Sequence, residues 1–265
     1  MSGLASRIVV TVVAAPIVLG AVWLGGLWML GLAAVAAFMA LHEFAELTRE
    51  LRPLVLAAYL GTSAVLAGAA LGGASWLLGG FLLTFPLAFA LYGFGATRRP
   101  ATIAVGSTIL GTGWIGLGLA CVILLRDLPE HGRLAAFTVL LAVWAADTLA
   151  FFVGRLVGRH KLAPRVSPGK TWEGLAAGTA AALAVCFFAL YDQGFLEGWR
   201  SLALGGAIAA AAAIGDLFES ALKRDVQVKD TGRLLGGHGG ILDRIDSLLF
   251  AAPAALYVVL ALGYG

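Results

Sequence analysis

Charged residues are scarce in this chain. They make up 12% of its 265 residues, whereas 60% are hydrophobic, and soluble domains usually contain only ~45–50% apolar residues. The chain also has only two cysteines, Cys121 and Cys186, which lie in apolar runs without metal-ligand spacing. We expect both to pack in the core, not to form a disulfide or a metal site. The composition excludes an ordinary soluble domain and predicts that most of the chain lies in lipid.

No polar segment is long enough for us to expect an appended soluble domain, and a membrane helix needs ~20 mostly apolar residues. We therefore predict an all-α polytopic membrane protein, formed by one integral membrane domain over residues 1–265. The first apolar run is interpreted as a retained helix and not as a cleaved signal peptide, because the next run follows at once. About nine membrane helices are expected, at residues 8–24, 27–44, 54–72, 75–95, 102–125, 134–154, 172–192, 201–218 and 247–263.

The basic residues are distributed unevenly between the expected loops. If all nine helices cross, one side of the membrane carries only Arg126, Arg133 and Arg200, which leaves 15 of the 18 Lys and Arg for the other side. The positive-inside rule places that richer side, with the N-terminus, in the cytoplasm. The net charge of +3 is modest, and we expect no nucleic-acid partner. The partner of most of the surface is the lipid bilayer.

Residues 220–246 form the densest polar block, SALKRDVQVKDTGRLLGGHGGILDRID, between two apolar segments. If the eighth helix continues past the membrane surface, one of its faces carries four polar residues, namely Asp216, Ser220, Lys223 and Arg224. Such a concentration of acids, bases and glycines beside the bilayer indicates chemistry. The alternative interpretation is a structural cluster of salt bridges.

The end of the block combines glycines with two acids. Gly239 and Gly240, within the run GGHGG, would let the backbone approach a ligand without a Cβ in the way. Asp243 and Asp246 lie three residues apart and face the same way on the expected ninth helix. Because neighbouring carboxylates repel each other, we expect them to share a hard cation such as Mg²⁺, which also binds substrate phosphates.

Two other segments carry polar residues that need an explanation. Asp147 lies about eight residues before Arg155, hence roughly 12 Å inside the helix end. It could form a structural hydrogen bond to another helix or line a polar site open to the cytoplasm. Residues 155–174 form a strongly basic loop, which could bind anionic lipid headgroups. Its SPGKT element, with Ser167 and Lys170, predicts a Pro-Gly turn that exposes N–H groups to a phosphate.

Taken in order, the block reads S-x-x-K-R-x4-K-D-x-G-x2-L-G-x-H-G-G-I-x-D-R-I-D from residue 220 to residue 246. This pattern resembles the signature of the phosphatidate cytidylyltransferases, also called CDP-diacylglycerol synthases. The segments WAADT, around Asp147, and SPGKTWEG, around Lys170, also look like those of this family. The resemblance covers the C-terminal half firmly and the N-terminal half by general character.

The resemblance implies a nucleotidyltransferase of phospholipid biosynthesis that converts CTP and phosphatidic acid to CDP-diacylglycerol and pyrophosphate. It also implies a bacterial cytoplasmic membrane and a polar cavity facing the cytoplasm. Residues 1–100 would be N-terminal helices, and residues 101–265 would carry the catalytic site. The metal carboxylates would be Asp216, Asp243 and Asp246, with Mg²⁺ and a second, monovalent cation such as K⁺.

The roles of the remaining residues are expectations from the same resemblance. The bases would bind phosphates, while Ser220 and His238 would donate hydrogen bonds or orient groups. We expect the catalytic residues to be Ser220, Lys223, Arg224, His238, Asp243 and Asp246. The expected substrate-binding residues are Asp147, Ser167, Lys170, Lys229, Gly239, Gly240 and Arg244.

Other classes of protein are alternatives to this interpretation. A CTP-dependent lipid kinase would use similar carboxylates and bases, and a transporter could also bury Asp147. A CDP-alcohol phosphotransferase would need the run D-G-x2-A-R, which the chain lacks. A homodimer is compatible with the sequence. Among the remaining polar residues, we expect Glu219 and Asp225 to be solvated or ion-paired, and His42 and Glu43 to lie at the membrane interface.

Overall fold

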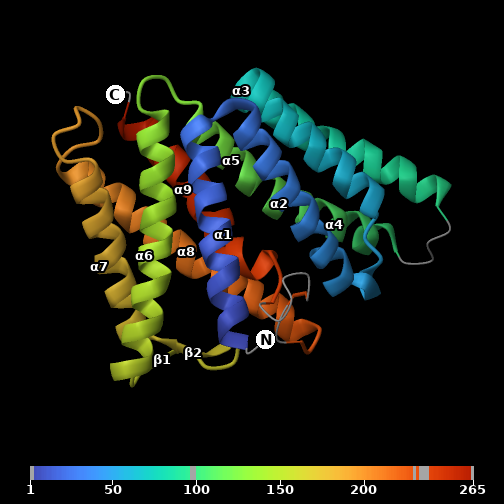
Figure 1. The fold of residues 1–265 in the computed structure, drawn as a ribbon. Coiled ribbons are helices and arrows are strands. Elements are labelled where there is room, and N and C mark those ends of the chain that lie inside the picture. Colours follow the sequence, from blue (N-terminus) through green and yellow to red (C-terminus); the bar gives the residue numbers. More distant parts are fainter. Residues whose placement is uncertain (1–2, 96–99, 229–230, 233–238, 264–265) are drawn as a thin grey trace. The chain divides into compact units, whose positions relative to one another are not determined.

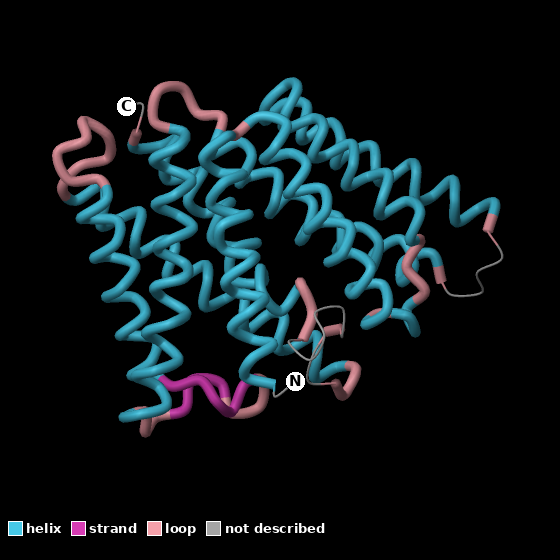
Figure 2. The backbone as a smooth tube through the Cα atoms, in the orientation of Figure 1, coloured by secondary structure: helices cyan, strands magenta, loops and turns pink. Residues whose placement is uncertain are grey.

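The fold is known from a computed structural model, which describes residues 3–95, 100–228, 231–232 and 239–263. In these residues the chain forms nine α-helices, two short strands, a 3₁₀ turn and a π-helical turn (Figures 1 and 2). The elements are α1 (Gly3–Leu24), α2 (Gly26–Leu47), η1 (Arg49–Leu51), α3 (Val55–Phe94), α4 (Ala101–Gly111), η2 (Thr112–Gly116), α5 (Leu117–Arg126), α6 (Gly132–Val157), β1 (Lys161–Ala163), β2 (Ser167–Thr171), α7 (Trp172–Ala189), α8 (Trp199–Asp225) and α9 (Leu242–Leu262).

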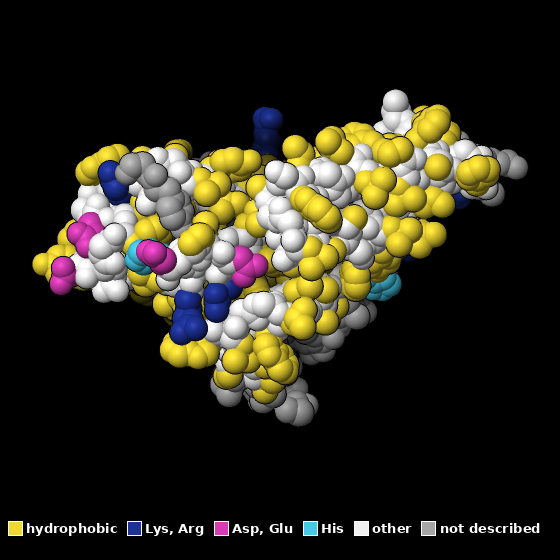
Figure 3. Space-filling view, turned by 90° about the horizontal axis from the view of Figure 1, so that it is seen from above, with side chains coloured by type: hydrophobic (Ala, Val, Ile, Leu, Met, Phe, Trp, Pro, Cys, Tyr) yellow, Lys and Arg dark blue, Asp and Glu magenta, His cyan; other side chains and the backbone are white. Residues whose placement is uncertain are grey.

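Most of these helices have the length and composition of membrane spans. In the described part of the chain, seven helices are long and apolar enough to cross a bilayer, counting α4, η2 and α5 as the single span Ala101–Arg126. Large hydrophobic side chains such as Leu27, Trp76 and Phe89 are exposed on their surfaces. Hydrophobic side chains are spread widely over the face shown in Figure 3. The chain is therefore a multi-pass, mainly helical membrane protein, as predicted.

The chain folds into two compact units. The first combines residues 1–127 with residues 228–245, and the second combines residues 128–227 with residues 246–265. The polar block at residues 220–246 therefore contributes to both units. The region expected to carry the site, residues 101–265, likewise belongs partly to each.

In the first unit, the junction between α1 and α2 is a glycine turn closed by an arginine. Gly25 and Gly26 have φ angles of 68° and 52°, which only glycine adopts easily. Arg126, the last residue of α5, donates from Nε to the Val22 carbonyl at 2.6 Å and from Nη2 to the Trp23 carbonyl at 3.1 Å. A cation at these carbonyls caps the C-terminal end of α1. The boundary expected between residues 24 and 27 is confirmed.

Helix α3 folds back on itself at Gly73, whose φ of 69° and ψ of −154° are not helical. Its glycines lie where the two arms touch. A Cβ on Gly61 would lie 2.7 Å from Thr84 Cγ2, and one on Gly68 would lie 2.6 Å from the Trp76 carbonyl carbon. The arms are therefore antiparallel and packed without side chains between them. This reversal confirms the break expected between residues 72 and 75.

In the second unit, small residues bring the backbones of the helices together. A Cβ on Gly174 would lie 2.6 Å from the Ala150 carbonyl oxygen of α6, and one on Gly178 would lie 2.7 Å from that of Ala146. Helix α8 meets α9 in the same way, because a Cβ on Gly215 would lie 2.6 Å from the carbonyl oxygen of Asp246. These glycines therefore let α7 pack closely against α6, and α8 against α9.

The basic loop between α6 and α7 contains a small antiparallel sheet. Strand β1 pairs with β2, with Lys161 opposite Thr171 and Ala163 opposite Ser167. One expectation is thereby wrong: SPGKT is a strand, not a Pro-Gly turn. The turn lies at residues 164–166 instead. Pro168 has no N–H to donate to the partner strand. It is accommodated because the pairing of β1 with β2 is irregular between the two paired positions, where a missing N–H is tolerated.

Candidate active site

One face of α8 carries a row of polar side chains in the second unit. Ser220 donates to Asp216 Oδ1 at 3.5 Å, and Lys223 Nζ lies 2.8 Å from Glu219 Oε2. Both pairs are four residues apart, so they lie one above the other on the helix. The structure therefore confirms that α8 stays helical to Asp225 and aligns these residues. Glu219 is buried, with 1% of its surface exposed. We expected it to be either solvated or ion-paired, and the structure shows the ion pair.

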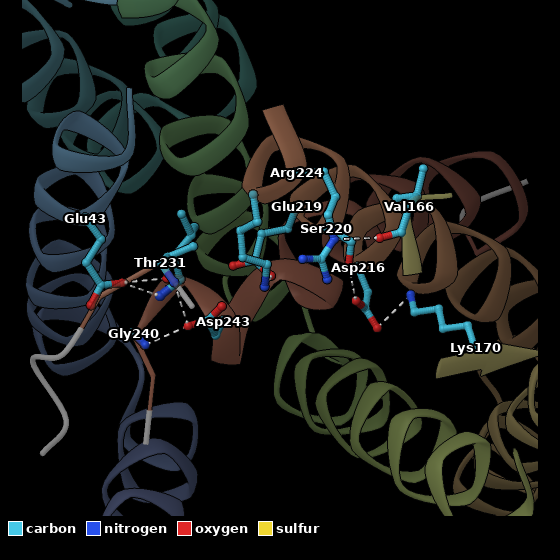
Figure 4. Close-up of polar contacts among 12 residues, drawn as sticks. Glu43, Val166, Lys170, Asp216, Glu219, Ser220, Arg224, Thr231, Gly240 and Asp243 are labelled. Carbon is cyan, nitrogen blue, oxygen red and sulfur yellow. Dashed lines mark hydrogen bonds and ion pairs between the residues drawn. The ribbon is translucent and has the colours of Figure 1, made fainter. Parts of the chain in front are cut away.

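The β-hairpin is joined to α8 at two points. At its base, Lys170 Nζ lies 2.7 Å from Asp216 Oδ2. Near its turn, the Val166 carbonyl accepts a hydrogen bond from Arg224 Nε at 3.2 Å. Figure 4 shows both contacts. Lys170 is thus fixed in position by its strand and by its ion pair, while part of its side chain stays accessible.

The end of the hairpin also starts α7. Thr171 is the N-cap of that helix, and its hydroxyl accepts the N–H of Gly174 at 3.1 Å, which satisfies one of the donors left over at a helix start. Glu173 accepts the backbone N–H of His160 at 3.2 Å and contacts its Nδ1 at 2.6 Å. These bonds hold the hairpin against α7, so the position of Lys170 is defined from both sides.

Helices α6 and α9 bring two more carboxylates to the same region of the second unit. Asp147 of α6 accepts a hydrogen bond from Ser247 of α9 at 3.3 Å and lies close enough to Asp216 and Lys170 to interact with their charges. Asp246 is buried next to Glu219 and also interacts with Asp216. Asp147, Lys170 and Asp216, which the sequence analysis assigned to one site, therefore lie near one another.

This arrangement places more negative than positive charge in a buried region. Glu219 and Asp246 are buried, Asp216 interacts with Asp246, and Asp147 interacts with Asp216. Buried like charges are unfavourable unless a proton or a cation compensates them. Among the described residues, however, no three or more His, Cys, Asp or Glu side chains are grouped as a complete metal site. A cation here would need oxygens from substrate or water besides the protein's carboxylates.

In the first unit, the start of α9 is held by two carboxylates. Asp243 Oδ2 accepts the N–H groups of Gly240, at 2.7 Å, and Thr231, at 3.2 Å. Glu43 of α2 accepts the N–H groups of Ile241 and Leu242, both at 2.9 Å. Figure 4 shows these contacts around Thr231 and Gly240. Asp243, expected to bind metal, thus has one oxygen committed to the backbone.

Glu43 was missed by sequence reasoning, which placed it at the membrane interface. Its side chain is instead fully buried. A signal was present, because Glu43 lies three residues after Ala40 and four before Leu47, on the helix face that both of these buried residues share. His42, next to it, is exposed and contacts Glu46 at 3.5 Å.

The remaining predicted site residues have diverse positions. Lys229 and His238 lie outside the described residues. Ser167 begins β2 and Arg244 is exposed in the first turn of α9. Gly239 has a φ of 78°, so its conformation requires glycine whether or not a ligand approaches it. Their predicted substrate contacts stay predictions.

Comparison with known proteins decides the family. The model of the cytidylyltransferase family matches residues 5–262. The chain belongs to this family. Members of it with curated names are similar to the chain over both halves, and the resemblance first seen in residues 220–246 is confirmed.

Three relatives show the extent of the similarity. A phosphatidate cytidylyltransferase of Haemophilus influenzae is 46% identical over 134 residues, which cover 49% of this chain and 46% of that protein. One of Pseudomonas aeruginosa is 40% identical over 194 residues, or 72% of this chain and 68% of that protein. One of Mycobacterium bovis is 33% identical over 250 residues, which cover 88% of this chain and 80% of that protein. The matched region thus spans from about half to four fifths of these relatives.

Proposed function

We propose that this chain is a phosphatidate cytidylyltransferase, which converts CTP and phosphatidic acid to CDP-diacylglycerol and pyrophosphate. The observation that carries the proposal is the Lys170–Asp216 pair, 2.7 Å long, set among the carboxylates of Asp147, Glu219 and Asp246 in a member of the cytidylyltransferase family. Carboxylates and bases fixed together by rigid helices suit phosphoryl chemistry, in which charge must be neutralised on both substrates.

The reaction needs no nucleophile from the protein. An anionic oxygen of phosphatidate attacks the α-phosphorus of CTP and forms the new P–O bond, while the bond from the α-phosphorus to the bridging oxygen breaks and pyrophosphate leaves. The work of the protein is positioning and charge neutralisation. We assign phosphate binding to Lys170, Lys223, Arg224 and Arg244. Lys223 is oriented for this by Glu219, and Arg224 by the Val166 carbonyl.

We propose that Mg²⁺ binds at Asp216 and Asp246, with Asp243 as a predicted third ligand and K⁺ as a predicted second cation. The residues of the second unit suit Mg²⁺, which takes oxygen ligands and usually one or two carboxylates, completed by water and substrate phosphates. When bound, the ion would polarise a phosphate and ease the departure of pyrophosphate. Ser220 and Lys170, which contact Asp216, would orient that carboxylate.

We also propose a topology of nine spans, in which both arms of α3 cross the membrane and α1 is the first span. The N-terminus, the β-hairpin and a polar cavity at the active site would then face the cytoplasm of a bacterial inner membrane. The antiparallel arms of α3 support this count. The excess of Lys and Arg in the hairpin and polar block supports the orientation.

The transferred group distinguishes the proposed reaction from its nearest competitor. Purified protein should transfer label from [α-³²P]CTP to the lipid in the presence of phosphatidate and Mg²⁺, whereas label from [γ-³²P]CTP should appear in pyrophosphate. A CTP-dependent lipid kinase would give the opposite pattern, with γ-label in the lipid and α-label in CDP. Thin-layer chromatography of both products reads the result. Label in lipid from γ-labelled CTP alone would refute the proposal.

A further inference from the structure

The buried carboxylate of Glu43 requires a reason, because it lies on a helix otherwise built for an apolar environment. Its neighbours on the buried face of α2 are Ala40, Leu41, Phe44 and Leu47, and 0% of Glu43 is exposed. A carboxylate is costly in such surroundings unless hydrogen bonds compensate the loss of water. Whatever keeps Glu43 there must therefore depend on the bonds that it accepts.

Among the described residues, Glu43 accepts hydrogen bonds from Thr231 and from the two residues at the start of α9. Oε1 accepts the N–H of Ile241 at 2.9 Å, and Oε2 accepts the N–H of Leu242 at 2.9 Å and the hydroxyl of Thr231 at 3.4 Å. The first N–H groups of a helix have no partner within the helix, and the helix dipole makes this end attractive to a negative charge. Glu43 thus caps α9 from a helix about 200 residues earlier in the chain, as the sequence separations of 198 and 199 show.

The glycines around this contact are shaped for Glu43. A Cβ on Gly232 would lie 2.7 Å from Glu43 Oε1, which is too close for real atoms. A Cβ on Gly240 would overlap both Glu43 Oε2 and the Thr231 hydroxyl. Two glycines of the polar block at residues 220–246 thus leave room for the Glu43 side chain of α2. Their presence is explained by this packing without a ligand.

Asp243 completes the arrangement from within α9. Its Oδ2 accepts the N–H groups of Gly240 and Thr231, so the two carboxylates together hold the N–H groups of Thr231, Gly240, Ile241 and Leu242. These four groups are therefore already used by the protein. The start of α9 is fixed by acidic side chains, and phosphates must be bound by other groups.

We propose that Glu43 is a positioning residue for the reaction: it fixes the first turn of α9 and thereby the helix that carries Asp243 and Asp246. This inference rests on the proposed cytidylyltransferase activity. Glu43 acts through the backbone of Ile241 and Leu242 and touches neither substrate. Because α9 continues from these residues, a shift of its start changes where its carboxylates lie, and small displacements of reacting groups cost much of the rate.

The variant Glu43→Gln tests the proposal at constant side-chain size. Whichever way the amide is turned, its NH₂ group faces one of the two N–H donors, so either Ile241 or Leu242 loses its acceptor. Folded, monodisperse variant should show faster hydrogen–deuterium exchange at residues 241–242. Its kcat should fall on the order of 10- to 100-fold, with a much smaller change in the KM for CTP.

A control on the same helix separates this effect from a loss of charge. Glu46 lies three residues further on, is 65% exposed in its side chain and pairs with the exposed His42 at 3.5 Å. Glu46→Gln should leave kcat and amide exchange at wild-type values. If Glu43→Gln yields no folded protein, Gly232→Ala replaces it, since the added methyl group displaces the carboxylate while keeping its charge. That variant should then lower kcat and speed exchange.

The outcomes separate the inference from the proposed function. Wild-type protein that transfers no α-label to lipid would refute the function, whereas the exchange rates still report whether Glu43 holds α9. With active wild type, a folded Glu43→Gln protein of unchanged kcat overturns the positioning role. A lower unfolding temperature with unchanged kcat in the folded fraction would show a purely structural role and would overturn it equally.

Discussion

At the scale of single residues, charge in an apolar chain is informative because each charged group needs a partner. Asp147, Lys170 and Asp216 were assigned to one site from three segments, and the structure places them near one another. The same reasoning failed for Glu43, which looked like an interfacial charge near a helix end, and for Glu219 it left open whether the charge is solvated or ion-paired. Whether such a residue is buried depends on which neighbouring helix faces it, and helical periodicity alone does not identify that neighbour. The sequence therefore indicated which polar segments lie close together better than it indicated the partner of each charged group.

Lys170 is the residue whose role is most sharply defined by its contacts. Replacing it in Lys170→Met keeps the length of the side chain and removes the charge opposite Asp216. We expect kcat/KM for CTP to fall about 10- to 100-fold, since hydrogen bonds to charged groups contribute about 1.5–3 kcal/mol. Steady-state kinetics with phosphatidate in mixed micelles measures this loss.

Lys161 provides the matched control for that variant. It lies in β1 of the same hairpin, and its side chain is exposed. Lys161→Met removes one charge from the hairpin but leaves the Lys170–Asp216 pair unchanged, so kcat/KM should stay within about twofold. Equal losses in both variants would mean that general attraction of the substrates, and not the Asp216 pair, explains the effect.

At the scale of elements, helices were easier to predict than the segments between them. Apolar runs gave α2, α6 and α9 within a few residues, because a membrane helix must satisfy its backbone internally over a fixed length. The SPGKT element was misjudged because Pro and Gly usually indicate a turn. Here its pairing with residues 161–163 and the contacts of Val166 and Lys170 with α8 stabilise a strand. Such tertiary contacts are not visible in local sequence.

The contact of α6 with α7 can be tested with a pair of glycines. In Gly178→Ala the new Cβ would lie 2.7 Å from the Ala146 carbonyl oxygen, so α7 must move away from α6. We expect a loss of about 1–3 kcal/mol in stability and a lower Tm in detergent, followed by tryptophan fluorescence. The shift would also disturb Asp147, which is next to Ala146, so activity should fall in the protein that remains folded.

Gly206 of α8 serves as the control, because a Cβ there would meet nothing within 4 Å. Gly206→Ala should stabilise the helix by about 0.5–1 kcal/mol, since alanine loses less conformational freedom on folding than glycine. If both variants change Tm in the same direction, the close approach at Gly178 does not control the packing of α7.

At the scale of the whole molecule, the sequence predicted a multi-pass helical protein because composition and run length suffice for that conclusion. It did not predict that the polar block would be shared between two compact units. That division depends on long-range contacts such as those of Glu43 with Ile241 and Leu242, which no local pattern reveals. The orientation of the chain in the membrane is predicted separately, from the distribution of Lys and Arg between the loops.

The proposed topology places the two ends of α7 on opposite sides of the membrane, and this can be tested. The β-hairpin precedes α7 and carries Lys161, Arg165 and Lys170, whereas residues 190–198 follow it. With α7 crossing the membrane, Gln193→Cys should react with a membrane-impermeant maleimide in intact cells, and Arg165→Cys should react only after the inner membrane is opened. Both positions are exposed. The native Cys121 and Cys186 are buried, so protein without an added cysteine should give little signal. Labelling of Arg165→Cys in intact cells, with none at Gln193→Cys, would invert the topology and place the proposed active site on the side of the membrane where CTP is absent.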